Sequence, residues 1–468
     1  MSCAILWFRN DLRLGDHPAL RAVLDRAPDQ ILFVYIWEPS EAAPWEPGAA
    51  SRVWLHHSLL ALSQSIEKKG GRLLLRRGPS LSTLRNLAQE HGASYVAWTR
   101  CYEPALVLRD TAIKASLESE RLTVETFNGS LIAEPWEVKT TTGGPYQVYT
   151  PFSRAVFKLR ERRDVLPEPR ILPPAPREAT SLQLEELKLL PRISWHREIE
   201  ASWTPGEAGA RRNLTEFVRN AVSDYEATRN FPALESGTSR LSPHLRFGEI
   251  SPNMVRARVE EALREPNVGH SLGYEVFLKE IVWREFAYHL LFHFPQTTTK
   301  PLRPKFERFP WKDDPERLKL WQKGETGYPI VDAGMRQLWR TGWMHNRVRM
   351  IVASFLVKDL LVSWQDGARW FWDTLVDADL ASNTLGWQWT AGCGADAAPY
   401  FRVFNPITQG EKFDPSGDYI RRWVPELSKL TSHVHHPWKS SVYTGGYPQQ
   451  IVDHSEARDE ALEAFARL

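Results

Sequence analysis

The stretch ASNTLGWQWTAG, residues 381–392, brings an asparagine and two tryptophans together among small and polar neighbours. A buried strand would surround the indoles with Val and Ile, and an ordinary amphipathic helix would surround them with Leu. On a helix, residues i and i+4 share a face, whereas residues i and i+2 point about 200° apart. If the stretch is helical, Asn383 and Trp387 therefore face one way and Trp389 faces another.

Two more polar clusters combine an arginine with groups that bind anions or flat rings. GTSRLS, residues 237–242, offers hydroxyls, an arginine and backbone N–H groups just before a predicted helix. Such a turn suits a phosphate group, or it is a plain turn with a helix cap. EIVWREF, residues 280–286, places Glu280, Trp283 and Arg284 on one helical face, either around a ligand or as a surface ion pair beside a core indole.

The segment GWMHNRVRM, residues 342–350, concentrates basic and amide side chains ahead of an apolar helix. These residues are His345, Asn346, Arg347 and Arg349. Either they contact a ligand or they form a solvated basic first turn. Because aromatic faces stack flat rings and arginines hold phosphates, the clusters together suit a large planar cofactor with phosphates, a nucleic-acid base, or both.

Asp377 and Asp379 in the segment DADL are a carboxylate pair, a metal site or a helix cap. Two carboxylates without a histidine or a third acid make a poor metal site. The cysteines, Cys3, Cys101 and Cys393, are far apart and lack metal-ligand spacing, so we expect neither a zinc site nor a disulfide framework. No metal is expected, and free cysteines fit a reducing cytoplasm.

The elements that must position these residues fall into an α/β half and a helical half. Residues 1–130 alternate short apolar runs with segments of helical spacing, which predicts an α/β domain with a parallel, doubly wound sheet. The predicted strands are 4–8, 31–37, 72–75, 95–98 and 122–127, and the predicted helices are 18–27, 51–68, 80–91 and 104–119. Residues 131–204 are a connector whose Pro-dense part, 165–178, is expected to be a semi-rigid extended linker.

Residues 205–468 are predicted to be an all-α domain, which holds most of the 20 tryptophans. Its predicted helices are 207–227, 251–264, 271–292, 315–323, 330–340, 344–363 and 366–376. The net charge of +2 is compatible with one local basic face. Because no apolar run approaches roughly 18 residues and the N-terminus has the reverse charge order of a signal peptide, we expect a cytoplasmic protein without a membrane anchor.

Long stretches of the chain resemble the photolyase/cryptochrome family, most closely the bacterial class III photolyases that act on cyclobutane pyrimidine dimers. These stretches are LWFRNDLRLGDHPAL (6–20), GTSRLSPHLRFGEIS (237–251), FLKEIVWREFAYHLL (277–291), GYPIVDAGMRQLWRTGWMHNRVRMIVASFLVKDLL (327–361) and WQWTAGCGADAAPYFRVFNPITQGEKFDPSG (387–417). The resemblance implies an α/β domain, a connector and a helical domain that binds FAD. It also implies light-dependent repair of pyrimidine dimers in UV-damaged DNA, by electron transfer from photoexcited reduced FAD to the flipped-out dimer.

The resemblance implies a set of FAD-contacting residues, with Arg349 as the charge partner of Asp377. The set is Tyr225, Arg229, Thr238, Ser239, Arg240, Leu241, Ser242, Arg349, Asp377, Asp379 and Asn383. The amide of Asn383 is expected to face flavin N5, where it favours the reduced form and assists catalysis together with Glu280. Trp387, Trp364 and Trp311 match the indoles that carry electrons from the surface to oxidised FAD, although simple packing also explains the last two.

The implied lesion pocket combines apolar faces with hydrogen-bonding groups. Its residues are Glu280, Trp283, Arg284, Asn346, Met350 and Trp389, and the implied DNA-backbone contacts are Arg347, Arg402 and Gln409. A dimer must flip out of the duplex to reach such a pocket, where Glu280 would hydrogen-bond the pyrimidine edge. Asn346 and Met350 stand where enzymes for (6-4) lesions carry a histidine pair, and an asparagine at 383 points to repair rather than signalling.

A second, light-harvesting chromophore is also implied, with methenyltetrahydrofolate as the expected compound. HFPQTTTKPLRP (293–304) and CYEPALVLRD (101–110) lack the residue pairs of one known folate pocket. Our antenna candidates are instead Trp37, Glu38, Arg52 and Trp54, with ordinary sheet–helix packing as the alternative. The competing interpretations of the whole chain are a cryptochrome-type photoreceptor without repair activity and a non-catalytic single-strand-binding module. We expect a monomer.

Overall fold

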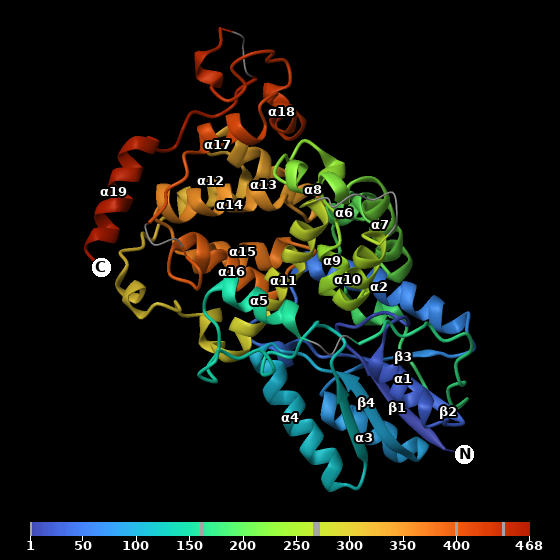
Figure 1. Ribbon diagram of the computed structural model, residues 1–468. Coiled ribbons are helices and arrows are strands. Elements are labelled where there is room, and N and C mark those ends of the chain that lie inside the picture. The colour runs from blue at the N-terminus through green and yellow to red at the C-terminus, as the bar shows by residue number, and fades with distance from the viewer. Residues whose placement is uncertain (1, 160–162, 265–271, 398–400, 442–444) are drawn as a thin grey trace.

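The N-terminal residues form a parallel sheet with the strand order β3-β2-β1-β4-β5 (Figure 1). The computed structural model of the protein describes residues 2–159, 163–264, 272–397, 401–441 and 445–468. The strands are β1 (Cys3–Phe8), β2 (Gln30–Trp37), β3 (Leu73–Arg77), β4 (Ala93–Thr99) and β5 (Thr123–Phe127). The helices between them are α1 (Pro18–Asp25), α2 (Ala49–Glu67), α3 (Ser80–His91) and α4 (Pro104–Ser119). All the strands and helices expected here are present, with small shifts at their ends.

Alternate residues of β1 pack into different cores on the two faces of the sheet. Leu6 and Phe8 join the core formed with α1 and α2. Ile5 and Trp7 join the core formed with α3 and α4. Because helices cover both faces, β1 has no polar side and its sequence is a continuous apolar run. The predicted doubly wound α/β domain is therefore confirmed.

The connector runs back along the α/β domain. Its helices are α5 (Tyr149–Lys158) and α6 (Arg197–Ser202), and the fully described stretch 165–178 contains neither helix nor strand. The backbone N–H of Leu172 donates to the carbonyl of Lys69 at 2.8 Å, and that of Ile31 donates to the carbonyl of Pro174 at 3.1 Å. The Pro-dense stretch is thus extended, as expected, but it is fixed to the domain it follows.

The second half of the chain is mostly helical, which confirms the predicted class. Its helices are α7 (Glu207–Asn220), α8 (Tyr225–Thr228), α9 (Ser242–Arg246), α10 (Pro252–Ala262), α11 (Leu272–His293), α12 (Pro315–Lys323), α13 (Pro329–Thr341), α14 (Asn346–Ser354), α15 (Trp364–Thr374), α16 (Leu380–Ala391), α17 (Pro406–Phe413), α18 (Asp418–Trp423) and α19 (His454–Ala466). The helix expected over 207–227 is split by a 3-10 turn at Val222–Asp224. The helix expected over 344–363 ends earlier and continues as a π-turn, Phe355–Asp359.

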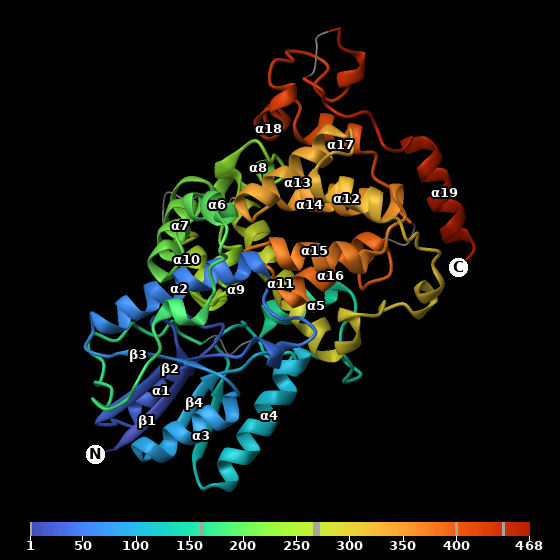
Figure 2. The same ribbon diagram turned by 180° about the vertical axis from the view of Figure 1, so that it is seen from behind.

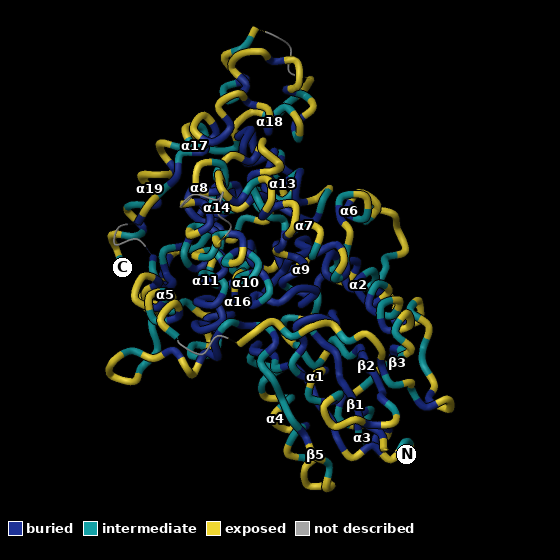
Figure 3. The backbone as a smooth tube through the Cα atoms, turned by 45° about the vertical axis from the view of Figure 1, so that its right-hand side comes forward, coloured by how far each residue is buried: buried dark blue, intermediate teal, exposed yellow. Residues whose placement is uncertain are grey.

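The two halves are packed together over helix α2, which lies between the sheet and the helical domain and contacts α15 (Figure 2). The guanidinium of Arg13 is buried and donates to the carbonyls of Gly15, Asp16, Gly129 and Gly248 over 2.7 to 3.0 Å. One cation thus joins the loop after β1, the segment after β5 and the helical domain. The sheet and the central helices are the most buried part of the molecule, whereas buried and exposed residues alternate along the chain around α18 (Figure 3). Within the described ranges, no helix is both long and apolar enough to cross a bilayer.

Candidate functional site

Helix α16 separates Trp387 from Trp389, as the spacing predicted. The side-chain amide of Asn383 donates to the carbonyl of Ala368 in α15 at 3.0 Å. Trp387 is 2% exposed and packs edge-on against Phe371, which also belongs to α15, with ring centroids 5.0 Å apart. Trp389 is only partly buried. Asn383 and Trp387 therefore contact α15, while Trp389 lies outside that interface.

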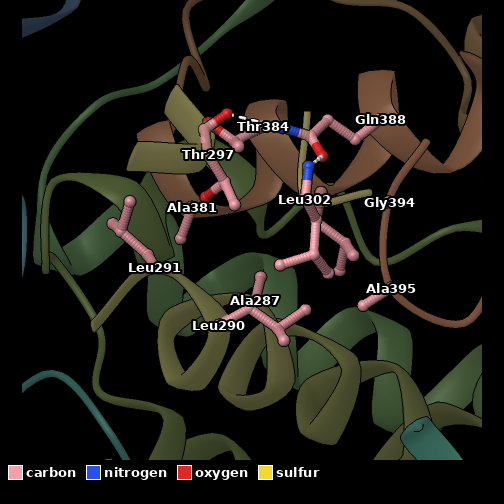
Figure 4. Close-up of a pocket in the computed structure, with 11 residues that line it drawn as sticks. Ala287, Leu290, Leu291, Thr297, Leu302, Ala381, Thr384, Gln388, Gly394 and Ala395 are labelled. Carbon is pink, nitrogen blue, oxygen red and sulfur yellow. Dashed lines mark hydrogen bonds between the residues drawn. The ribbon is translucent and has the colours of Figure 1, made fainter. Parts of the chain in front are cut away.

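A second face of α16 packs against α11. Ala381, Thr384 and Gln388 line a small cavity there with residues of α11, and its volume of about 20 Å³ leaves room for little more than a water molecule (Figure 4). The Gln388 side chain fills the polar end, since its Oε1 accepts from the Leu302 N–H at 2.9 Å and its Nε2 donates to the Thr297 carbonyl at 2.6 Å. This face is a packed interface.

The remaining side of α16 is accessible. Ser382 and Gly386 are exposed and Trp389 is partly exposed, so the three form a strip at helical spacing. A Cβ added at Gly386 would meet no atom within 4 Å in the described part of the chain. A flat group can approach the backbone of α16 closely along this strip.

The DADL segment that leads into α16 contains an ion pair and a helix cap. Asp377 Oδ2 accepts from Arg349 Nη2 at 2.8 Å, which confirms the expected partner. Asp377 Oδ1 is buried and finds no hydrogen-bond partner among the described residues. Asp379 caps α16 by accepting from the Ser382 N–H at 2.8 Å, and it also accepts from the Tyr288 hydroxyl. Of the three interpretations of Asp377 and Asp379, the helix cap is therefore present in the structure, at Asp379. The described residues include no cluster of three or more metal-ligating groups.

The turn at 237–242 leads into the five-residue helix α9. Thr238 and Ser239 are partly exposed, Ser242 is exposed and its Oγ accepts from the indole N–H of Trp343 at 3.3 Å, and Leu241 is buried. The guanidinium of Arg240 lies 4.0 Å from the ring centroid of Trp203, so this cation is stacked. The hydroxyls of the turn are the groups available to a phosphate.

Helices α8 and α11 bring an expected FAD residue and an expected lesion residue into contact. Arg229 Nη1 donates to Glu280 Oε1 at 2.5 Å. Tyr225 stands one turn earlier, and burial raises the pKa of its hydroxyl well above the ordinary value, so it stays neutral. The surface ion pair considered for Glu280 and Arg284 is wrong, because Arg284 Nη1 turns to the carbonyl of Ser130 at 2.8 Å.

Trp283 has an unexpected partner. Tyr149, at the start of α5, stacks on it with ring centroids 3.6 Å apart and planes inclined by 5°. The Tyr149 hydroxyl donates to the carbonyl of Lys279 at 2.7 Å, which fixes the stack to α11. One face of this indole is therefore covered by the connector, and only its other side and edges are available to a ligand.

Basic side chains gather beside the Glu280–Arg229 pair. Arg347 donates to Asn230 Oδ1 at 2.7 Å and also lies 3.7 Å from Met350 Sδ. Burial, with the like charges of Arg229 and Arg402, lowers the pKa of Arg347. Nearby accessible polar groups are Asn346, Arg402 and Gln409. Arginines held this close together against their mutual repulsion favour an anion such as a phosphate.

His345 is the N-cap of α14, and its Nδ1 accepts from the Arg347 N–H at 3.2 Å. Burial and the neighbouring arginines lower its pKa to about 3, so the imidazole is neutral at physiological pH. The helix-start interpretation of this cluster is therefore correct for His345, whereas Arg347 and Arg349 project into the site.

The three tryptophans proposed as an electron chain come from different elements. Trp387 and Trp364 are each 2% exposed in the same core, and Trp311 is partly exposed at its edge. The backbone N–H of Lys312 donates to the carbonyl of Leu361 at 2.8 Å, which brings the Trp311 segment beside the chain that enters α15 at Trp364. Two of the three indoles are thus buried in the core, and the third reaches the surface.

A separate cavity of about 340 Å³ lies between the α/β domain and the helical domain. Trp37 and Glu38 line it. Arg52 and Trp54 do not line the described cavity. Arg52 is exposed, whereas Trp54 is buried and its indole N–H donates to Glu249 Oε1 at 3.0 Å. Trp54 therefore follows the alternative of ordinary sheet–helix packing.

Sequence reasoning missed several residues of this interdomain cavity. Four of its side chains carry buried N–H groups for which the described residues supply no hydrogen-bond acceptor: Trp7 Nε1, Arg9 Nε, Trp45 Nε1 and Arg246 Nη1. Such a wall suits a ligand rich in acceptor atoms. Trp7 and Arg9 lie at the end of β1, where ligands of parallel sheets bind, and that position was the available signal.

Comparison with known proteins agrees with this geometry. Residues 4–173 match the family model described as DNA photolyase, and residues 277–467 match the model described as FAD binding domain of DNA photolyase. An α/β domain followed by a helical FAD-binding domain defines a class of flavoprotein. A deoxyribodipyrimidine photo-lyase of Agrobacterium fabrum is 50% identical over 99% of this chain and 98% of its own length.

A plant cryptochrome and a solved photolyase structure are also similar to this chain. Cryptochrome-2 of Arabidopsis thaliana is 38% identical over 99% of this chain and 78% of its own length. A solved structure of a bacterial class III photolyase from Agrobacterium tumefaciens superimposes with a TM-score of 0.95 at 48% identity, covering 100% of this chain and 98% of that one. The chain belongs to the photolyase/cryptochrome family.

Proposed function

We propose that this protein is a light-dependent photolyase that repairs cyclobutane pyrimidine dimers in UV-damaged DNA with reduced FAD. The observation that carries the proposal is the arrangement around α16, where Asn383 and Trp387 contact α15 and Trp389 borders an accessible strip. The full-length similarity to a deoxyribodipyrimidine photo-lyase supports the same conclusion. A single-strand-binding module would need neither this strip nor the Arg349–Asp377 pair beside it.

The residues present fit FAD. The unpartnered Asp377 Oδ1 would accept a hydrogen bond from it, and the open side of Gly386 leaves room for a flat ring. The hydroxyls of Thr238, Ser239 and Ser242 would hold the phosphates, with Arg240 and Leu241 shaping the turn and Tyr225 and Arg229 closing the other side. When bound, reduced FAD supplies the photoexcited electron that opens the cyclobutane ring.

The protein's own residues would bind and orient the flipped dimer. Glu280 would accept from the pyrimidine edge through its Oε2 while Oε1 keeps Arg229 in place. Trp389 and the uncovered side of Trp283 would enclose the dimer, together with Met350, Asn346 and Arg284. Arg347, Arg402 and Gln409 would contact phosphates of the flanking DNA, so binding should weaken as salt increases. Asn383, held by Ala368, would keep its amide oriented toward the cofactor.

Trp387, Trp364 and Trp311 would carry electrons inward when the bound flavin is oxidised. The burial of Trp387 and Trp364 in one core and the partial exposure of Trp311 support this role. The interdomain cavity would hold a second chromophore, with methenyltetrahydrofolate as the proposed compound, since Trp37 offers a stacking face and the unpartnered donors match the acceptors of a pterin ring. The protein would act as a cytoplasmic monomer.

The test uses UV-irradiated oligo(dT) and the purified protein with its FAD reduced. We expect dimers to disappear under blue light and to persist in the dark. Persistence of dimers in the light would contradict repair and favour a cryptochrome-type photoreceptor. Chromatography of the compounds released on denaturation identifies the second chromophore, and the absence of a folate there would contradict that part of the proposal.

A further inference from the structure

Arg246 lies between the interdomain cavity and the segment that precedes α16. It is the last residue of α9, four residues after Ser242, and its side chain is 10% exposed. Its Nε donates to the carbonyl of Ala378 at 2.6 Å. Ala378 stands between Asp377, which pairs with Arg349, and Asp379, which caps α16. One guanidinium thus holds the backbone that connects two expected FAD residues.

The other side of the same guanidinium faces the cavity. Arg246 Nη1 is buried and has no hydrogen-bond acceptor in the ranges that the structure describes; the nearest carboxylate oxygen, Glu103 Oε1, is 3.9 Å away. Both Arg246 and Glu103 line the cavity. A buried N–H group that lacks a hydrogen-bond acceptor is costly, so a ligand that presents an acceptor to Nη1 gains a charge-assisted hydrogen bond.

Leu380 provides a second contact between the interdomain cavity and the segment that precedes α16. Leu380, the first residue of α16, also lines the cavity, and it directly follows Asp379. A ligand in the cavity therefore touches the start of the helix that carries Asn383 and Trp387, and it touches the arginine that holds the preceding carbonyl. Both contacts act on the same short segment, 377–380.

We propose that Arg246 is a positioning residue that couples the interdomain cavity to the FAD site, so that an acceptor-bearing planar ligand in the cavity tightens the binding of FAD. The inference rests on the proposed function only in taking FAD as the ligand beside α16. The coupling is reciprocal, because two ligands that stabilise one arrangement of segment 377–380 raise each other's affinity by the same factor. Loading of one chromophore would then favour loading of the other.

Arg109 supplies a matched control for Arg246. It is an arginine that lines the same cavity, but its guanidinium pairs with Glu41 at 3.1 Å and Asp110 at 2.7 Å, both within the α/β domain. Arg109→Gln thus removes a cation from the cavity wall without touching Ala378. Arg246→Gln removes both the cavity donor and the guanidinium that holds Ala378.

The experiment titrates FAD into the FAD-free full-length protein by equilibrium dialysis, with and without saturating methenyltetrahydrofolate. For the wild type we expect FAD to bind about tenfold more tightly when the folate is present. Arg246→Gln should bind FAD about tenfold more weakly without folate and should show no folate effect, whereas Arg246→Lys should recover part of the FAD affinity. Arg109→Gln should keep the wild-type FAD affinity measured without folate, because Arg109 does not contact segment 377–380.

Equal FAD affinity of the wild type with and without folate would overturn the coupling, whether the folate fails to bind or binds without effect. Unchanged FAD affinity in Arg246→Gln would overturn the positioning role. The repair assay on UV-irradiated oligo(dT) is independent of both results. Coupling without repair would contradict only the proposed function, and repair without coupling would contradict only the coupling.

Discussion

Replacing Gly367 by alanine tests whether helix α15 sets the position of Trp387. A Cβ added at Gly367 would lie 2.1 Å from Cη2 of Trp387 and 2.7 Å from Cδ2 of Leu356. Since ordinary contacts begin at 3.4 Å, the indole would have to withdraw by roughly 1.3 Å. Trp387 is 2% exposed and also packs edge-on against Phe371 and Trp321, so the core has little space for this movement.

The expected cost follows from two opposing effects. Overpacking a core destabilises by about 1–3 kcal/mol, whereas alanine in place of a helical glycine stabilises by about 1 kcal/mol. We expect Gly367→Ala to lower the free energy of unfolding of the FAD-free protein by up to about 2 kcal/mol. The matched control is Gly386→Ala in α16, where the added Cβ meets no described atom within 4 Å. That variant should be more stable by about 1 kcal/mol in the FAD-free protein.

Denaturant unfolding of the two FAD-free variants measures both free energies. In the FAD-loaded protein, displacement of Trp387 should also slow the photoreduction of oxidised flavin, which is followed by absorption under blue light. A Gly367→Ala variant with wild-type stability and wild-type photoreduction would refute the argument that α15 fixes the indole.

Further predictions concern Glu280, Trp387 and Glu285. Glu280→Ala should keep FAD bound but weaken the binding of UV-irradiated oligo(dT) by about 1–3 kcal/mol and lower the repair yield; unchanged repair would remove this residue from the lesion site. Trp387→Phe should block photoreduction of oxidised FAD but spare repair by chemically reduced protein, and rapid photoreduction would reveal another route. Burial raises the pKa of Glu285 from 4.5 to about 7, so the folded state binds more protons and stability falls as pH rises between these values. Glu285→Gln should therefore gain up to about 3 kcal/mol over the wild type at pH 8 and lose this advantage near pH 5, and an equal difference at both pH values in denaturant unfolding would contradict the buried titration.

Local patterns along the chain determined the elements and many of their ends. Helix α12 runs over Pro315–Lys323, as its spacing predicted, because the side chain of Asp314 caps the start and Gly324 ends it with a φ of 67°. The helical spacing of Asn383, Trp387 and Trp389 was likewise enough to predict that the two indoles point in different directions. These signals act between residues a few positions apart, and for that reason they can be read from the sequence.

Only the tertiary structure decided which side chains meet. Glu280 has an arginine one turn along its own helix, yet it pairs with Arg229, the residue after α8. Trp283 is stacked by Tyr149 from the connector, and Trp54 packs beside Glu249 rather than in the cavity expected for it. Each of these partners depends on how whole helices and loops pack, since segments far apart in the chain contribute to one free-energy minimum.

The interdomain cavity separates most clearly what the sequence determined from what only the tertiary structure decided. The ends of β1 and β2 were predictable as a ligand-binding edge, because parallel sheets bind ligands there. Its opposite wall, with Arg246, Trp372 and Leu380, comes from the helical domain. Hydrophobic periodicity predicted a helix around Trp372, but it predicted none that includes Arg246 or Leu380, and only the contact between the two domains brings the three residues to one cavity.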